Sequence, residues 1–263
     1  MNKHLILLLR CFGFSRPRPK TRLQRILRHA ERMLAVLLLL YLGLLLFPQV
    51  LFAHSVSSHG ITIYSRAPLP PEATECAERA ASLLSHSELA VPGRHERVFV
   101  CDSPWLFRLF NPAGTPFAIS YPVTDHVFVA AADFRKNVAR RYAPDFNTRS
   151  LSGVMAHEIS HGLIRHRLGL LRSKRLPDWV NEGYCEYLVQ ESSFPEAEGL
   201  PLMASGQNHP SPAYRYFTYR QMVRYLMEGR GLSFADVVAR AGDSPTVQSE
   251  ARAWLQTQND RLQ

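Results

Sequence analysis

The feature that most restricts the fold is a run of twenty residues without charge, Met33 to Phe52 (MLAVLLLLYLGLLLFPQVLF). About twenty consecutive apolar residues, folded as a helix, cross the hydrocarbon core of a bilayer. Pro48 and Gln49 lie near the end of the run, where a membrane helix tolerates them. We therefore expect one transmembrane helix over residues 33–52, which separates a short arm from the rest of the chain.

The arm before this run carries almost all of the net charge. Residues 1–32 contain nine Lys or Arg and one acid, Glu31, whereas the remaining residues contain 22 basic and 21 acidic side chains. Positive charge beside a span favours the cytoplasmic side. The sequence thus predicts a cytoplasmic N-terminus and an extracytoplasmic body, periplasmic in a bacterium. The nearly neutral body argues against nucleic acid as a partner.

The apolar run has a second interpretation, as a cleaved signal peptide. Leu51-Phe52-Ala53 matches a signal-peptidase site poorly, and the run is long for a signal peptide. A retained single-pass anchor is therefore favoured, with the cleaved form left open. We expect a basic arm over residues 1–32, the anchor over 33–52, a linker over 53–60 and one folded domain over 61–263.

The folded domain contains the motif H-E-x-x-H at His157-Glu158-Ile159-Ser160-His161. An apolar row with helical spacing runs through it, formed by Leu151, Met155, Ile159 and Leu163. Gly169 follows at a place typical of a helix C-terminus. The spacing predicts a helix on which His157 and His161 lie on one face, four residues apart.

Two imidazoles on one helical face are suited to binding a single zinc ion. Catalytic zinc commonly takes three protein ligands and keeps one position for water. Glu158 lies at the edge of the same face, where its carboxylate can accept a proton from that water. The motif therefore predicts His157 and His161 as zinc ligands and Glu158 as the general base.

The third ligand is expected from the segment Trp179 to Tyr187 (WVNEGYCEY). Pro177-Asp178 is typical of a helix start, with Asp178 as the N-cap. On such a helix Glu182 and Glu186 share a face. One carboxylate can bind zinc, and the other can accept the outer N–H of a ligating histidine; the residues alone leave open which does which.

H-E-x-x-H followed about twenty residues later by W-x-N-E-G-x-x-E resembles the gluzincin metallopeptidases, over roughly residues 127–231. The resemblance implies a zincin-like α+β domain, with a small mixed sheet, the active-site helix and a helical C-terminal half. It implies that Glu182 is the third zinc ligand and that Glu186 supports His157. It also implies an oxyanion-stabilising tyrosine at Tyr216, with Tyr219 as the second choice; packed core tyrosines are the plainer interpretation.

The other expected elements are ordinary. Strands are expected over 61–64, 97–101 and 126–131, and helices over 72–87, 103–110 and 220–228, with a final helix pair from Ser233. The stretch 192–212 is expected to be a loop near the cleft. The strand over 126–131 is either an edge strand that pairs with extended substrate or a core strand, and Arg140-Arg141 are expected to be surface charge.

Four cysteines add little to the prediction. Cys11 belongs to the cytoplasmic arm. Cys76 and Cys101 lie outside the membrane, where a disulfide between them is possible but undecided by sequence. Cys185 is interpreted as a small buried residue that points partly away from the metal rather than as a ligand.

These observations favour a membrane-anchored zinc metallopeptidase that acts on a peptide or protein substrate. The motif lies about a hundred residues beyond the apolar run, which argues against an intramembrane protease. The sequence does not contain the G-x-M-E-N motif of aminopeptidases, which favours an endopeptidase or action on small peptides. Two alternatives stay open: another zinc hydrolase that acts on the cell wall, and a catalytically silent, membrane-tethered binding module.

Overall fold

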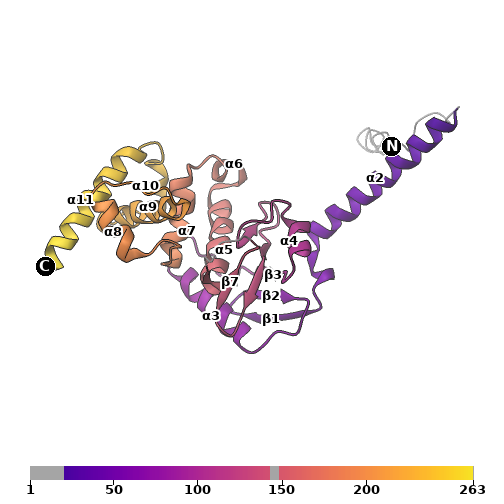
Figure 1. Cartoon of the computed structure of the whole chain (residues 1–263), viewed down its shortest axis with the longest axis horizontal. Helices are drawn as coiled ribbons and strands as arrows, with labels where there is room; N and C mark the ends of the chain where they lie inside the picture. The colour runs from indigo at the N-terminus through magenta and orange to yellow at the C-terminus, as the bar shows by residue number, and fades with distance from the viewer. Residues whose placement is uncertain (1–20, 143–147, 263) are drawn as a thin grey trace. The chain divides into compact units, whose positions relative to one another are not determined.

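The computed structural model describes residues 21–142 and 148–262, drawn in colour in Figure 1. The chain divides into two units, which meet between Leu51 and Phe52. The first contains helix α2 (Arg22–Leu46) and a 3₁₀ turn, η1 (Pro48–Leu51). Thr21 caps α2 and forms a reciprocal capping box with Gln24.

Helix α2 is long and apolar enough to cross a membrane, and none of its residues is buried. Its bounds differ from the expected 33–52. It begins at Arg22, because the capping box lies there, and it ends at Leu46, because Pro48 restricts the residue before it and cannot continue a helix. The first twenty residues of the expected arm, with Cys11, lie outside the described residues.

The second unit begins earlier than expected. Residues 53–60 were predicted to form a linker, but strand β1 (His54–Ser58) pairs antiparallel with β2 (Ile61–Ser65). The turn residues His59 and Gly60 both have positive φ, 47° and 80°. This is the backbone of a tight two-residue hairpin, which matches the twist of the strands.

The main sheet has five strands in the order β1-β2-β3-β5-β4, with β3 at Glu96–Val100, β4 at Ala118–Ser120 and β5 at Val127–Val129. The three central strands are parallel, and the two outer strands run antiparallel to them. β5 is therefore not the edge strand: β4 is. The expected strand over 126–131 is also split, because Ala131 belongs to a different sheet.

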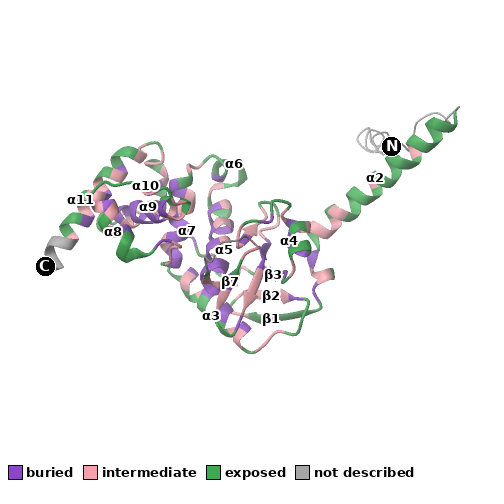
Figure 2. Cartoon of the chain, in the orientation of Figure 1, coloured by how far each residue is buried: buried purple, intermediate pink, exposed green. Residues whose placement is uncertain are grey.

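That second sheet is small and antiparallel. It contains β6 (Ala131–Asp133), β7 (Val138–Arg140) and β8 (Arg149–Ser150). β8 leads directly into helix α5 (Leu151–Leu168), and α3 (Glu72–Ser85) packs beside it. These two helices pack on the main sheet and bury its apolar face, and both carry buried residues, purple in Figure 2.

The opposite face of the main sheet is aromatic. Phe99 stacks on Tyr64 and on Phe128, with ring centroids 4.8 and 5.2 Å apart. Phe52 packs on Phe99 at 5.1 Å, and Phe110 of helix α4 (Pro104–Phe110) stacks on Phe128 at 4.1 Å. The residue at which the chain enters the domain thus helps to cover this face.

The C-terminal half is helical, as predicted. Its helices are α6 (Leu170–Ser173), α7 (Asp178–Val189), α8 (Glu196–Ala204), α9 (Pro212–Arg224), which continues as a π-helical turn η2 (Tyr225–Gly229), α10 (Phe234–Ala239) and α11 (Ser244–Leu262). The expected loop over 192–212 is partly wrong because it contains α8. The helix expected from Arg220 begins at Pro212, a residue well suited to a first helical turn. The coarse prediction, an α+β domain behind one apolar helix, is confirmed.

The disulfide considered between Cys76 and Cys101 is not present. Cys76 and Cys101 are both free and buried. Cys76 packs in the core with Val98 and Val100, whereas Cys101 continues the alternation of β3 on the side of Phe99. Because successive strand residues point to opposite faces, the sheet lies between the two sulfur atoms.

Candidate active site

Helix α5 presents the H-E-x-x-H motif as predicted. Ser150 caps its N-terminus by accepting a hydrogen bond from the Gly153 N–H at 2.9 Å, and Gly169 ends it with φ of 79°. The rings of His157 and His161 lie one turn apart, with centroids separated by 5.0 Å. Both imidazoles lie largely within the protein rather than in solvent.

Helix α7 crosses beside α5 and supplies both expected carboxylates. Its N-cap is Pro177 rather than Asp178, which is the first helical residue. The glycine of the N-E-G sequence has a packing role: a β-carbon at Gly183 would lie 2.7 Å from the carbonyl oxygen of Tyr219 and 2.9 Å from Val223 Cγ2. Gly183 therefore allows α9 to approach α7 closely, which brings Tyr216 to the site.

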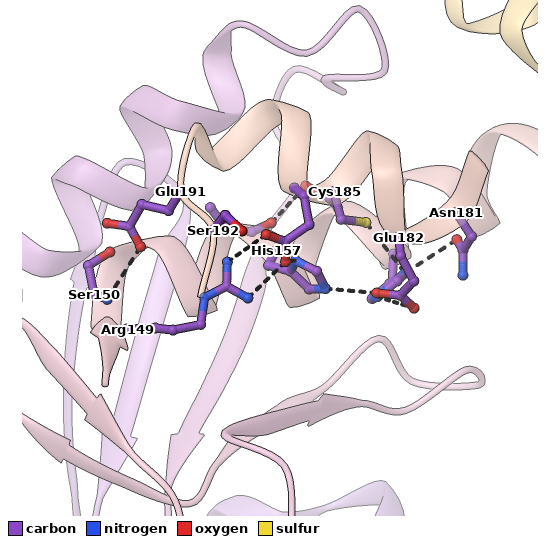
Figure 3. A network of polar contacts seen from close by, with 12 residues as sticks. Arg149, Ser150, His157, Asn181, Glu182, Cys185, Glu191 and Ser192 are labelled. Carbon is purple, nitrogen blue, oxygen red and sulfur yellow. Dashed lines mark hydrogen bonds and ion pairs between the residues drawn. The ribbon is translucent and has the colours of Figure 1, made fainter. Parts of the chain in front are cut away.

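Glu182 lies opposite both histidines. Its Oε2 is 3.2 Å from His157 Nε2, and its Oε1 is 3.6 Å from His161 Nε2 (Figure 3). Two donors that each lie 2.0–2.2 Å from one tetrahedral ion would be roughly 3.3–3.5 Å apart. The nitrogen and oxygen atoms therefore have the spacing, and the chemical types, that fit a zinc ion.

The outer nitrogen of His157 faces a second carboxylate. His157 Nδ1 lies 3.1 Å from Glu186 Oε1, and Glu186 accepts two hydrogen bonds from the Arg149 guanidinium, at 2.8 and 3.2 Å (Figure 3). The Glu186 and Arg149 side chains are only 3% and 12% exposed. This geometry matches the supporting role expected of Glu186 and distinguishes it from Glu182.

Arg149 was not anticipated from the sequence. It lies in β8, 37 residues before Glu186, and no local pattern marks an arginine as the partner of so distant a carboxylate. The paired guanidinium holds Glu186 in one orientation, because a bidentate pair fixes both carboxylate oxygens. Arg149 thus fixes the carboxylate that lies 3.1 Å from the outer nitrogen of His157.

Charge in the metal-free site follows from these contacts. Burial disfavours the charged form of His157, but Glu182 and Glu186 outweigh it and raise the pKa of His157 to about 10. Burial alone would raise the pKa of Glu182, but the two histidines and Arg149 lower it to about 2. Burial lowers the pKa of His161. Glu182 is therefore a carboxylate at any ordinary pH, as a metal ligand must be.

A second set of donors lies next to the first. One ligand atom each of His157, His161 and Cys185 falls within 4.8 Å of the others. Cys185 Sγ is 3.5 Å from His161 Nδ1, and Asn181 Oδ1 is 3.3 Å from the same nitrogen (Figure 3). Cys185 is free and fully buried, as predicted, and its sulfur lies on the outer side of the His161 ring, away from Nε2.

The set with Glu182 fits a catalytic ion better. When His161 Nδ1 carries the proton and donates it to Asn181 Oδ1, the lone pair is on Nε2, toward Glu182. Cys185 is fully buried, and burial holds the pKa of its thiol well above the usual value. Its sulfur lies 3.5 Å from His161 Nδ1, on the side of the ring away from Nε2. Cys185 and Asn181 therefore serve best as outer partners of His161.

A cavity of about 480 Å³ opens over these residues. Its lining includes Pro116, Phe117, Ala118, Arg141, Arg149, His157, Glu158, His161, Glu182, Glu186, Ser193, Ser211 and Tyr216. Within the described part of the chain, no hydrogen bond or ion pair occupies the Glu158 carboxylate. Arg141, expected to be surface charge, instead lines the cavity and lies 5.2 Å from the centre of the Phe117 ring.

Of the two tyrosines considered, Tyr216 lines the cavity and Tyr219 does not. The rings are 6.3 Å apart, edge to face, and the Tyr219 carbonyl packs against Gly183. Burial, and then the nearby Glu182 charge, raise the pKa of Tyr216. Its phenol thus keeps its proton near neutral pH and can donate a hydrogen bond into the cavity.

Comparisons of the chain with protein-family models, with curated proteins and with solved structures found no match. Functional conclusions therefore depend on the site itself. A pair of histidines, a carboxylate between them, a free carboxylate in a polar cavity and a phenol donor form a set suited to hydrolysis of a carbonyl compound.

Proposed function

We propose that this chain is a membrane-anchored, zinc-dependent peptidase of the gluzincin type. The observation that carries the proposal is the convergence of His157 Nε2 and His161 Nε2 on one carboxylate, Glu182, at 3.2 and 3.6 Å. These three residues would hold the ion. When bound, zinc acts as a Lewis acid toward a carbonyl oxygen and lowers the pKa of a water molecule.

The protein residues have separate roles in the proposed reaction. Glu158 accepts a proton from the attacking water and passes it to the leaving amine, which requires a carboxylate without another partner. Tyr216 donates a hydrogen bond to the oxygen on which negative charge develops. Glu186, held by Arg149, keeps the His157 ring in place.

A peptide substrate is favoured by the strand next to the cavity. β4 is one of the two edge strands of the main sheet, and its first residue, Ala118, lines the cavity together with Phe117. The free edge of a strand can pair with an extended peptide through main-chain hydrogen bonds. This assigns to β4 the role that the sequence suggested for residues 126–131, and it favours cleavage within a chain.

The membrane anchor is part of the proposal. α2 has the length and composition of a span, and the basic residues lie on its N-terminal side. By the positive-inside rule the arm is cytoplasmic, and the catalytic domain is extracytoplasmic. The substrate would then be a protein or peptide outside the cytoplasm.

The test is metal analysis and peptide hydrolysis with the full chain in detergent, for the wild type, Glu182→Ala, Cys185→Ala and Glu158→Gln. We expect one zinc per chain in the wild type, lost in Glu182→Ala and retained in the other two. Hydrolysis of a peptide library should be lost only in Glu182→Ala and Glu158→Gln. Zinc that depends on Cys185 but not on Glu182 would refute the ligand set, and a zinc-free wild type would refute the peptidase.

A further inference from the structure

The aromatic face of the main sheet has a composition that the proposed peptidase chemistry does not explain. Strand alternation places Thr62 and Tyr64 on the same side as Phe99 and Phe128. Arg97 lies opposite Thr62 in the register and shares this side. Helix α4 covers part of the face.

The outer surface of α4 carries a large exposed aromatic side chain. Trp105 is 60% exposed, and the Arg66 guanidinium carbon lies 5.4 Å from the centre of its ring. Leu106, Phe107 and Phe110 of the same helix are buried against the domain. Trp105 is therefore exposed on a helix that packs against the domain through these three buried apolar residues.

The charges on this face have one sign. Arg66 and Arg97 are exposed, as is Arg108 of α4. Among the described residues of β1 to β5 that point this way, and in α4, no Asp or Glu occurs. Trp105, Arg66, Arg97 and Arg108, called the α4 face below, thus give this side of the sheet and the outer surface of α4 exposed cationic side chains and one exposed aromatic ring.

The position of the α4 face along the chain identifies its partner. Phe52 packs on Phe99 and lies 6.4 Å from Phe110 of α4, so the chain enters the domain on this side. Only residues 47–51 separate Phe52 from the end of α2 at Leu46. Five residues span at most about 18 Å when fully extended. A bilayer crossed by α2 therefore lies within reach of this side of the domain.

We propose that the α4 face docks on the headgroup layer of the membrane that α2 crosses. Trp is enriched at this depth because its ring is apolar and its N–H is polar. Arginine pairs with lipid phosphate, and each cationic residue near an anionic surface adds about fivefold to binding. Docking holds the domain in one orientation toward the bilayer. The inference depends on the anchor in the proposed function, but not on the zinc chemistry.

The test uses the full chain in lipid nanodiscs with brominated acyl chains, which quench tryptophan at short range. The chain has three tryptophans, of which Trp179 is buried and Trp254 lies in α11. We expect quenching of the wild type that is lost in Trp105→Phe. In nanodiscs that contain anionic lipid, Arg66→Gln and Arg97→Gln should each shift the docked-to-free ratio about fivefold toward the free form. Arg172→Gln, on α6, is the matched control.

Two results would overturn the proposal in distinguishable ways. A chain that enters nanodiscs but shows equal quenching with and without Trp105 is anchored and not docked, and the α4 face would then be free for a protein partner. A chain that does not enter nanodiscs refutes the anchor itself. Neither result bears on zinc content or hydrolysis, which are measured separately.

Discussion

The substitution Glu186→Gln is the sharpest probe of how the site is held. Gln keeps the size of Glu186, but it removes the charge that faces both His157 Nδ1 and the Arg149 guanidinium, at 3.1 and 2.8 Å. Arg149 then stays buried without its counter-charge. The His157 ring can then adopt more than one orientation, because the glutamine amide can turn either its N–H or its oxygen toward His157 Nδ1.

Two magnitudes follow from this geometry. Loss of an outer partner of a ligating histidine lowers metal affinity about 10–100-fold, which corresponds to about 1.4–2.7 kcal/mol. Removal of one partner of a buried ion pair costs roughly 3–5 kcal/mol, and we expect the lower end because Gln still accepts one hydrogen bond. We therefore expect both the zinc affinity and the free energy of unfolding of Glu186→Gln to fall, each by its own amount.

The assay is competition for zinc against a chromophoric chelator, together with thermal unfolding of the metal-free chain. Glu191→Gln is the matched control. Glu191 lies just after α7 and accepts a hydrogen bond from the Ser150 N–H, but it touches neither histidine. In the double variant Arg149→Met with Glu186→Gln, part of the stability should return while zinc affinity stays low. Wild-type zinc affinity in Glu186→Gln would refute the supporting role of this carboxylate.

Three further outcomes follow from the structure. Gly183→Ala should lower the free energy of unfolding by about 1–3 kcal/mol, seen as a lower Tm, because its β-carbon would clash with Tyr219 and Val223. Gly242→Ala is the control and should leave Tm unchanged, because a β-carbon at Gly242 meets open space. Zinc binding at pH 7.5 should release about one proton, because the pKa of His157 without metal is about 10 whereas the pKa of His161 is lowered. Calorimetry in buffers of different ionisation enthalpy measures the number of protons released. Zinc binding without proton release would contradict the prediction. Tyr216→Phe should lower kcat about 10²–10³-fold with zinc retained, and Tyr219→Phe should have little effect.

The sequence by itself determined the elements whose signal is local. The row from Leu151 to Leu163 with Gly169 after it defined α5 closely, because an apolar stripe and a terminal glycine act within one helix. The spacing of His157 and His161 followed from the same periodicity. The charge-free run gave the apolar helix, although the capping residue Thr21 and Pro48 set its ends.

Other features were decided only in three dimensions, because they depend on contacts between segments far apart in the chain. Strand order placed β4 rather than β5 at the edge, and it placed Cys76 and Cys101 on opposite faces of the sheet. The close approach of α7 and α9, which Gly183 permits, distinguished Tyr216 from Tyr219. The pairing of Arg149 with Glu186 decided that Glu186 faces Nδ1 of His157 and Glu182 faces Nε2. The i to i+4 spacing of the two glutamates does not distinguish these two arrangements.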